Sequence, residues 1–506
     1  MPDPQNDLLS TVRDFHVQGQ LDRAEPLYRE IIEADPENAE AWHLLGVLML
    51  QKGQGVDAES YLSEAIKLKP DEAKYFNNLS SAQKLGGKVT EAEGSLRKAV
   101  ELDPNFADGH VNLGYLLSEA ERYDEAIVSY RSAIEHYPKI AELHQNLAHA
   151  LFQVGLLDEA KLICLKALSL KPDLSTAQNV LGGILAGLNE LPEAIDAYEK
   201  ALSAGAVTIS SYNNLGLIYR TQRNFEAAES NYRRALSLEP ENVDSLVGLA
   251  SVLMASGQEH KAIETFQQIL AIDPENGDAK HMISALSGRT TDTAPEAYVK
   301  SLFDFYAPNF DQDLTERLQY KIPFQMREVV DQYFADQEPG VTPEFKCLLD
   351  QGSGTGLVGE AFQNCTDVMI GLDLAPKMIA AASEKEIYDE LHEIELVDYL
   401  AGPLSADRSF DIVAAADVFI YIGKLDNLFE ATVKRLQSGA LYVFSVENSN
   451  SEDFILRSSG RYAQSRAYIE RLASTHGFSI EVAEPAKIRK HGNKFMQGTI
   501  YILKYL

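Results

Sequence analysis

A short glycine-rich stretch has the residue types and spacing of a ligand-binding loop. After the apolar residues Leu348 and Leu349, the chain reads Asp-Gln-Gly-Ser-Gly-Thr-Gly from Asp350 to Gly356. Glycine lets a backbone turn sharply and approach a ligand without a Cβ in the way. A helix that begins near Thr355 would direct its N-terminal N–H groups toward a negatively charged group. The stretch therefore predicts a strand, an anion-binding loop and a helix.

An acidic residue follows this loop at a distance that suits a nucleotide site. Asp373 lies about 17 residues after Gly356, at the end of a second apolar run, where a carboxylate can hold two ribose hydroxyls. Two cofactor classes compete. Gly354 to Gly359 reads G-x-G-x-x-G, the dinucleotide fingerprint. Asp350 to Gly356 reads D-x-G-x-G-x-G, with an acid two residues before the first glycine.

The elements that must position these residues alternate along the second half of the chain. From residue 345 on, short β-rich apolar runs alternate with amphipathic stretches, which predicts a doubly wound parallel sheet. The last two strands join without a helix, so we expect an antiparallel pair at that edge. Helical patterns at 297–310 and 314–334 precede the sheet. The expected strands are 346–351, 367–372, 390–395, 410–415, 439–446, 478–483 and 498–503.

Four segments, in this order, resemble class I S-adenosylmethionine-dependent methyltransferases. The loop at 350–356 is similar to their first motif, and 373–378 (Asp-Leu-Ala-Pro-Lys-Met) to their second. Residues 410–418 are similar to their fourth-strand segment, and 438–441 to the turn before their fifth strand. The ordered set favours this family over the dinucleotide-binding alternative. It implies a Rossmann-like domain of seven strands that uses S-adenosylmethionine.

The resemblance also implies which residues bind the cofactor. The glycine loop would hold the methionine moiety, with Asp350 in direct or water-mediated contact, and Asp373 would bind the ribose hydroxyls. Leu374 and Met378 would bracket the adenine, and Glu395, where many relatives have Asp, would accept from its amino group. The full expected set is Asp350, Gly352, Ser353, Gly354, Thr355, Gly356, Asp373, Leu374, Met378, Glu395, the backbone N–H of Leu396, Asp417 and Tyr306.

Candidates for a general base or an orienting group are Asp417, Tyr421 and His491, with Glu447 as a further choice. Asp417 follows the fourth strand and would lie near the transferred methyl or the ammonium of the cofactor. His491 belongs to a small basic stretch at 487–494, which either meets an acidic substrate or forms a solvated loop.

The segment 302–310 resembles the lid helix that covers the cofactor in many relatives. Its aromatic residues, Tyr306 among them, either contact cofactor or substrate or pack against the sheet. Both interpretations stay open at the level of the sequence.

The first half of the chain repeats itself every 34 residues. The phase defines eight units from Gln5 to Asn276, and 277–286 follows as a capping helix. The pattern resembles the tetratricopeptide repeat, a helix–turn–helix unit whose neighbours must stack to bury their apolar faces. Together with the methyltransferase-like segment that follows, the repeats resemble the predicted bacterial methyltransferases that are fused to tetratricopeptide repeats. The recurring residues are Ala24, Ala58, Ala92, Ala126, Ala160, Ala194, Ala228 and Ala262, with Pro36, Pro70, Pro104, Pro138, Pro172, Pro240 and Pro274.

Asparagine recurs at the sixth position of four units, and Val180 interrupts the series. Similar ladders hold extended peptide backbones in some members of the repeat family, because an amide both donates and accepts hydrogen bonds. Alternatively, the sequence Asn-Leu-Gly is simply common at that position of the repeat, and the asparagines have no binding role. The resemblance implies a protein or peptide partner in the concave groove, contacted by Asn78, Asn112, Asn146 and Asn214.

The composition excludes several classes of protein. Among 506 residues, 45% are hydrophobic and 24% charged, and the formal net charge is −31. These values are normal for globular chains, and the acidity argues against nucleic acid or an anionic membrane as partner. Three cysteines without metal-ligand spacing predict neither a disulfide framework nor a metal site. Without a leader pattern or a long apolar run, the expected location is the cytoplasm.

The predicted architecture is an all-α solenoid at 1–288, a linker at 289–296 and an α/β methyltransferase domain at 297–506. The favoured function is methylation of a protein or peptide that the repeats recruit. A small-molecule methyltransferase, whose repeats serve interaction or assembly, is the first alternative. A non-catalytic repeat scaffold is the second.

Overall fold

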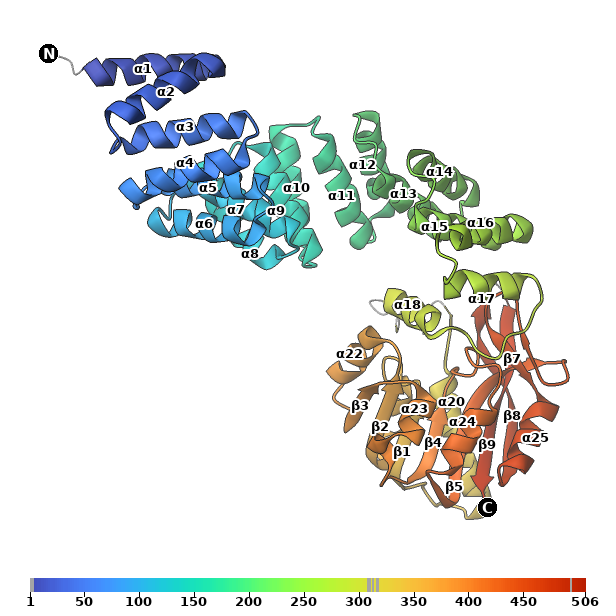
Figure 1. The fold of residues 1–506 in the computed structure, drawn as a ribbon. Helices are drawn as coiled ribbons and strands as arrows, with labels where there is room; N and C mark the ends of the chain where they lie inside the picture. Colours follow the sequence, from blue (N-terminus) through green and yellow to red (C-terminus); the bar gives the residue numbers. More distant parts are fainter. Residues whose placement is uncertain (1–3, 307–310, 312–313, 315–317, 492–493) are drawn as a thin grey trace. The chain divides into compact units, whose positions relative to one another are not determined.

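In the computed structural model, a helical array precedes a part built on a β-sheet (Figure 1). The structure describes residues 4–306, 311, 314, 318–491 and 494–506. The chain divides into two compact units, Met1–Pro240 and Glu241–Leu506. The second unit therefore includes the last helices of the array as well as the sheet.

The period seen in the sequence recurs in the helices. The first helices of successive repeats begin at residues 39, 73, 107, 141, 175, 209 and 243, which are spaced by 34 each time. The repeat solenoid predicted from the sequence is confirmed. The helices are α1 (Pro4–Val17), α2 (Leu21–Ala34), α3 (Ala39–Gln51), α4 (Gly55–Leu68), α5 (Ala73–Leu85), α6 (Val89–Leu102), α7 (Ala107–Glu119), α8 (Tyr123–His136), α9 (Ala141–Gln153), α10 (Leu157–Leu170), α11 (Ser175–Gly187), α12 (Leu191–Ser203), α13 (Ile209–Thr221), α14 (Phe225–Leu238), α15 (Val243–Ala255), α16 (Glu259–Ile272) and α17 (Gly277–Leu286).

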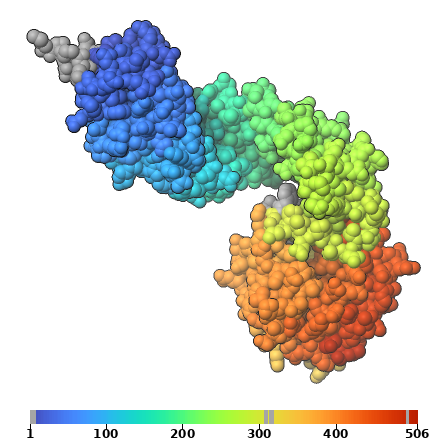
Figure 2. Space-filling view, viewed as in Figure 1, coloured from blue at the N-terminus to red at the C-terminus, as the bar shows by residue number. Residues whose placement is uncertain are grey.

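Glycine in the first helix of a repeat allows the close approach of the second. A Cβ on Gly114 would lie 2.7 Å from the ring of Tyr130, and one on Gly182 would lie 2.8 Å from the ring of Tyr198. Both tyrosines are buried, so their rings have no room to move aside. The space-filling view shows the repeats of the first unit, in blue to green, as a continuous surface (Figure 2).

We expect Gly114→Ala to lower the free energy of unfolding of the array by about 1–3 kcal/mol, because the new methyl overpacks against Tyr130. Gly94→Ala, in α6, is the matched control, since a Cβ there meets nothing within 4 Å. Its higher helix propensity should stabilise the array by about 0.5–1 kcal/mol. Urea unfolding followed by far-ultraviolet circular dichroism measures both changes, and equal effects of the two substitutions would contradict the packing argument.

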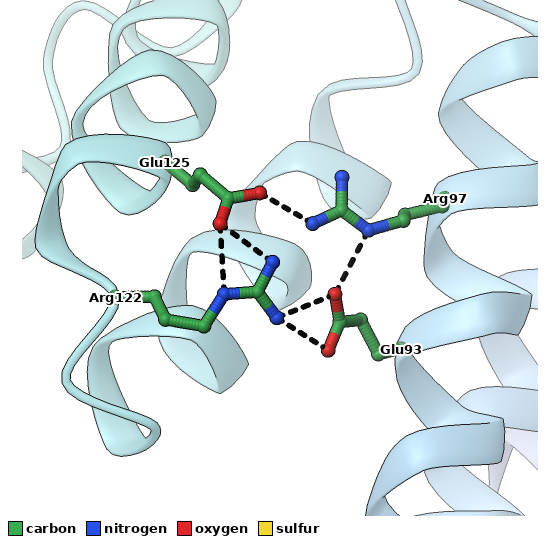
Figure 3. Close-up of polar contacts among 4 residues, drawn as sticks. All are labelled: Glu93, Arg97, Arg122 and Glu125. Atoms are coloured by element: carbon green, nitrogen blue, oxygen red, sulfur yellow. Dashed lines mark hydrogen bonds and ion pairs between the residues drawn. The ribbon is translucent and has the colours of Figure 1, made fainter.

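Ion pairs link neighbouring repeats on the outside of the array. Arg97 of α6 binds both Glu93 and Glu125, and Arg122, just before α8, binds the same two carboxylates (Figure 3). These side chains keep 20 to 46% of their surface exposed. Each pair is therefore worth little singly, although the closed network fixes how one second helix lies against the next.

The second unit contains a mixed sheet in the strand order β3-β2-β1-β4-β5-β9-β8. The seven predicted strands are all present, and the last two are antiparallel as predicted. A hairpin of two further short strands, β6 and β7, was not predicted and continues from the end of β5. The strands are β1 (Phe345–Gln351), β2 (Thr366–Asp373), β3 (Glu390–Glu393), β4 (Phe410–Ala415), β5 (Leu436–Ser449), β6 (Phe454–Leu456), β7 (Tyr462–Ser465), β8 (Phe478–His491) and β9 (Lys494–Tyr505).

Helices cover both faces of this sheet, because successive strand residues point to opposite sides. Leu348 packs into one core with Met326 of α20, whereas Leu349 packs into the other with Leu428 of α24 and Tyr468 of α25. This is the expected Rossmann-like arrangement. The helices of the second unit are α18 (Glu296–Tyr306), α20 (Ile322–Gln337), α21 (Leu357–Phe362), α22 (Pro376–Glu384), α23 (Leu396–Ala401), α24 (Asp426–Val433) and α25 (Arg466–Thr475).

Of the segment predicted as a linker, 289–296, residues 289–295 lie against the sheet domain as an extended strap, and Glu296 begins α18. The N–H of Ala294 donates to the carbonyl of Tyr421 at 3.0 Å, and the N–H of Lys424 donates to the carbonyl of Asp292 at 2.8 Å. Just before the strap, His281 of α17 contacts the carbonyl of Gly460 at 2.9 Å. The strap therefore holds the backbone of the loop that follows β4.

Candidate active site

The glycine loop joins β1 to α21 at the carboxyl edge of the sheet. Gly352, Gly354 and Gly356 have φ angles of 79°, 53° and 94°, in the left-handed region that favours glycine. A Cβ on Gly352 would lie 2.6 Å from Cγ2 of Val418, whereas one on Gly354 would meet nothing within 4 Å. The loop is thus packed on one side, against the segment that follows β4, and open at Gly354.

Asp373, at the end of β2, ties the glycine loop to the neighbouring strand. Its Oδ2 accepts from the N–H of Gly354 and its Oδ1 from the N–H of Ala375, both at 2.9 Å. Burial raises the pKa of Asp373, although the N–H groups of Ala375, Gly354 and Leu374 act in the opposite direction. Each carboxylate oxygen can accept a second hydrogen bond, so the predicted role toward two hydroxyls is compatible with this geometry.

Asp350 is fully buried beneath the loop. Its Oδ2 accepts from the hydroxyl of Tyr388 at 2.6 Å, and that hydroxyl accepts from the N–H of Gly359 at 3.1 Å. Burial raises the pKa of Asp350 to about 7, against the opposing effect of the Tyr388 hydrogen bond. Nothing in the local sequence marks Tyr388 as a site residue, because only the fold places it under the loop.

Two buried polar atoms at the loop have no hydrogen-bond partner among the described residues. Among the residues that the structure describes, Oδ1 of Asp350 and Oγ of Ser353 are buried without a hydrogen bond. Buried polar atoms in proteins ordinarily form hydrogen bonds. A bound ligand that contacts these two atoms would supply the hydrogen bonds that they lack. A carboxylate oxygen and a hydroxyl beside open loop backbone fit the ammonium and carboxylate of an amino-acid moiety. Thr355 is engaged differently, since its hydroxyl donates to Asp311.

Glu395 begins α23 as its N-cap residue. Its Oε2 accepts from the N–H groups of Val397 and Asp398, at 2.6 and 2.9 Å. The side chain is half-buried, and burial raises its pKa. Leu396, the first residue of α23, is buried. The predicted contacts of Glu395 and Leu396 with an adenine stay predictions, and the structure adds the helix cap.

A cluster of charges fills the carboxyl edge beyond β4 and β5. Asp417 has a φ of 61° and binds Arg489 of β8, and Arg489 also binds Glu447 of β5. Glu447 accepts from Arg457 as well, at 2.6 Å. Arg489 is only 4% exposed and Glu447 only 1%. The basic stretch at 487–491 is therefore part of a strand with a buried arginine, and not a solvated loop.

Tyr421 lies beside this cluster in a buried position. The side chain of Arg461 interacts with that of Tyr421, and the Phe303 ring of α18 meets the Tyr421 ring edge to face at 5.3 Å. Burial raises the pKa of Tyr421 above its usual range. Tyr306 and His491 are in α18 and β8, but their side chains are not among those that the structure describes.

The structure thus brings most of the predicted site residues to one edge of the sheet. Contact between Gly352 and Val418 joins the glycine loop to the segment that holds Asp417. Leu374 is half-buried after β2, and Met378 is fully buried in α22. The sequence missed the arginines at 457, 461 and 489, because only tertiary contacts distinguish them from exposed basic residues.

In the array, the predicted asparagine ladder is largely bonded within the protein. Asn78 contacts His43 at 2.7 Å, Asn112 donates to Asn77 at 2.8 Å, and Asn214 donates to the hydroxyl of Tyr198 at 2.9 Å. Asn146 is half-buried. A pocket of about 300 Å³ lies beside Asn112, and its other walls include Ser80, Ser81, Lys84, Tyr115 and Glu119. The role of the ladder toward a peptide stays a prediction.

Two further observations on the described residues concern metal binding and membrane spanning. In the described part of the chain, no group of three or more His, Cys, Asp and Glu side chains is arranged to hold a metal ion. None of the described helices has the length and apolarity needed to cross a lipid bilayer.

Comparisons with known proteins agree with this geometry. Tetratricopeptide repeat models match residues 18–81, 117–184 and 219–286, and also 73–106 and 95–128. A methyltransferase domain model matches residues 349–442, which include the glycine loop, Asp373 and Asp417. No curated protein matches the chain.

Several solved structures are similar over part of the chain. Cut9 with Hcn1, from a hetero-tetramer of the APC/C, is 19% identical with a TM-score of 0.40, over 55% of each chain. MamA is 27% identical with a TM-score of 0.30, over 32% of this chain and 94% of that one. PilF of Pseudomonas aeruginosa is 22% identical with a TM-score of 0.37, over 42% and 97%. This chain spans about half the length of the first of these.

The repeat period, the sheet with its glycine loop and the matching models lead to one conclusion: the chain joins tetratricopeptide repeats in its N-terminal part to a methyltransferase domain in its C-terminal part.

Proposed function

We propose that this protein transfers a methyl group from S-adenosylmethionine to a substrate bound at the carboxyl edge of the sheet, and that the repeats recruit a protein or peptide that is, or carries, this substrate. One observation supports the cofactor assignment most directly. The loop tied to Asp373 leaves Oδ1 of Asp350 and Oγ of Ser353 buried and without partners among the described residues.

The residues present fit S-adenosylmethionine. Ser353 and the open backbone at Gly354 would hold its methionine moiety, with Asp350 toward the ammonium, and Asp373 would take the ribose hydroxyls. When bound, the cofactor supplies a methyl group already activated on a sulfonium. The protein then has to orient the nucleophile and exclude water, which is the role we assign to Asp417 and Tyr421 beside the loop.

A protein or peptide partner is supported by the repeats and by the pocket beside Asn112. That pocket combines the carbonyl of the Asn112 side chain, the aromatic ring of Tyr115, and Lys84 and Glu119, which are ion-paired with each other at 2.6 Å. Such a mixture suits a peptide segment, which presents backbone amides together with side chains of varied character.

A small-molecule substrate is the second candidate, and a specific observation favours it. The charged groups around Asp417 are deeply buried, with Arg489 at 4% and Glu447 at 1% exposure. A compact substrate reaches them more easily than a folded protein surface does. In that case the repeats recruit a partner or assemble the enzyme.

The test is the transfer of labelled methyl from S-adenosylmethionine into a cell lysate, compared between wild type and Asp373→Ala. The variant removes the hydrogen bonds that Asp373 accepts from Gly354 of the loop and from Ala375, together with the proposed ribose contact, so we expect at least a 100-fold loss of cofactor affinity and the loss of labelling. Asp367→Ala, at the exposed start of the same strand, is the matched control. Calorimetry gives the affinities.

The fate of the label separates the candidates. Label in a discrete protein band supports recruitment of a protein substrate, and label only among small metabolites supports the second candidate. Cofactor binding by the wild type without any labelling would favour a non-catalytic scaffold. Binding of a dinucleotide in place of S-adenosylmethionine would overturn the assignment of the loop.

A further inference from the structure

Three guanidinium groups and two carboxylates meet at the edge where a substrate would face the cofactor. We call these five residues, Arg457, Arg461, Arg489, Asp417 and Glu447, the arginine cluster. They come from separate places in the chain: the segment after β4, the end of β5, the turn between β6 and β7, and β8. Val418, next to Asp417, touches the glycine loop, so the cluster adjoins the cofactor site.

Four of the five charges are paired with one another. Arg489 binds Asp417 and Glu447, and the second oxygen of Glu447 binds Arg457 at 2.6 Å. Arg457 also donates to the carbonyl of Asn448 at 2.6 Å. Both oxygens of Glu447 and Oδ2 of Asp417 are thereby committed to two arginines.

Arg461 is the remaining charge. The N–H of Tyr462 donates to the carbonyl of Ile420 at 2.8 Å, which places Arg461 beside Tyr421. The guanidinium of Arg461 interacts with the side chain of Tyr421, and it forms no ion pair within 4.0 Å with a described carboxylate. Burial by itself would lower the pKa of Arg461, but its interaction with Tyr421 and the carboxylates of Asp417 and Glu447 raise it above the ordinary value. Arg461 therefore stays protonated, and the arginine cluster carries one net positive charge.

Arg461 is half-buried, and a guanidinium that is partly withdrawn from water is costly unless an anion or several hydrogen bonds compensate it. Arginine presents a planar fork of N–H donors that matches the two oxygens of a carboxylate. A single excess positive charge is balanced by a monoanion, whereas a phosphate monoester brings about −1.5 to −2 at neutral pH. The charge balance thus favours a carboxylate over a phosphate.

We propose that the substrate of this protein carries a carboxylate group, which Arg461 binds with the help of Tyr421 next to the glycine loop. This inference rests on the proposed methyltransferase function and specifies its substrate class. A free organic acid and an acidic or C-terminal residue of a peptide supply the same chemistry, and the experiment separates these two sources.

The test uses the full chain and labelled S-adenosylmethionine with three portions of one lysate. One portion is untreated, one has its carboxylates converted to amides with a carbodiimide and ethanolamine, and one has its phosphate monoesters removed with a phosphatase. We expect amidation to abolish labelling and phosphatase treatment to leave it unchanged. Labelled protein would identify a peptide carboxylate, and labelled metabolites would identify a free acid.

Variants at Arg461 connect the result to the site. Arg461→Met should reduce labelling by about 10- to 100-fold, because a hydrogen-bonded ion pair with the substrate is lost. Arg461→Lys keeps the charge without the fork and should retain more activity than Arg461→Met. Arg466→Met, in the exposed first turn of α25, should label like the wild type.

Cofactor binding by each variant, measured by calorimetry, distinguishes a failure of the carboxylate proposal from a failure of the proposed methyltransferase function. Unchanged affinity of Arg461→Met for S-adenosylmethionine shows that the fold and the cofactor site are intact. The carboxylate proposal is overturned if the amidated lysate is labelled as well as the untreated one, if phosphatase treatment abolishes labelling, or if Arg461→Met labels like the wild type. Failure of the wild type to bind S-adenosylmethionine would instead contradict the proposed function itself.

Discussion

Arg489→Met is expected to lower the free energy of unfolding of the sheet domain by about 3–5 kcal/mol. Arg489 is 4% exposed and is the shared partner of Asp417 and Glu447. Methionine has a similar shape, so it fills the space but leaves the Asp417 carboxylate without its cation. Removing one member of a buried ion pair costs more than the pair contributes, because the remaining charge stays poorly solvated.

The measurement has to follow the sheet domain alone. Trp42, the one tryptophan of the chain, lies in the repeat array, so its fluorescence does not report on the sheet. Hydrogen exchange of the amides of β5 and β8 at increasing urea concentration does. Arg466→Met, an exposed control, should change the free energy of unfolding by less than about 0.5 kcal/mol.

A second comparison isolates the electrostatic cause. Asp417→Asn and Glu447→Gln, added to Arg489→Met, neutralise the carboxylate of Asp417, which the single variant leaves without a cation, and that of Glu447, which keeps only Arg457. The triple variant should therefore recover part of the lost stability. Equal or greater instability of the triple variant, or wild-type stability of Arg489→Met, would contradict the assignment of this cluster as a buried ion-pair network.

Asp350→Asn is expected to become progressively more stabilising, relative to the wild type, as the pH rises from about 4 to about 7. The pKa of Asp350 is raised from 3.8 to about 7 in the folded protein, because its carboxyl is buried. Between these two values the folded state binds more protons than the unfolded state does. The contribution of Asp350 to stability therefore falls as the pH rises.

At 1.36 kcal/mol per pKa unit, the full difference amounts to about 4 kcal/mol above pH 7. Asparagine stays neutral and can still accept from the hydroxyl of Tyr388, so the variant escapes this loss. Thermal unfolding of the cofactor-free protein at pH 5, 6, 7 and 8 measures the difference between the two proteins. Asp367→Asn, an exposed control on β2, should differ from the wild type by the same small amount at every pH.

A constant difference between Asp350→Asn and the wild type across this range would show that Asp350 is ionised throughout. The prediction applies to the protein without cofactor. A bound cationic ammonium beside Asp350 would favour the ionised carboxylate and shift the transition to lower pH.

The sequence by itself determined the features that depend on local pattern. The 34-residue period predicted the helix pairs, because each repeat is one unit whose apolar positions recur in phase. The alternation of strands and helices predicted the sheet, and the glycine loop with Asp373 predicted its ligand-binding edge. Each of these signals depends on residue types at fixed spacings along the chain, so it can be recognised without knowledge of tertiary contacts.

The boundaries of these elements were less well determined. The third strand ends at Glu393, so that Glu395 caps a helix, and residues 289–295 pack along the loop after β4. The hairpin of β6 and β7 was missed because strands of three and four residues are too short for a pattern of alternation. It carries Arg461 in its turn, so this omission also concealed part of the arginine cluster.

Only the tertiary structure decided which charges and amides are engaged. Arg489 meets Asp417 across 72 residues of chain and Glu447 across 42, and Tyr388 meets Asp350 across 38. Asn112, expected to face a peptide, donates to Asn77 of the preceding repeat. A residue type and its spacing reveal what a side chain can do. Which partner it binds depends on how separate elements are brought together, because burial and distance set the strength of each polar contact.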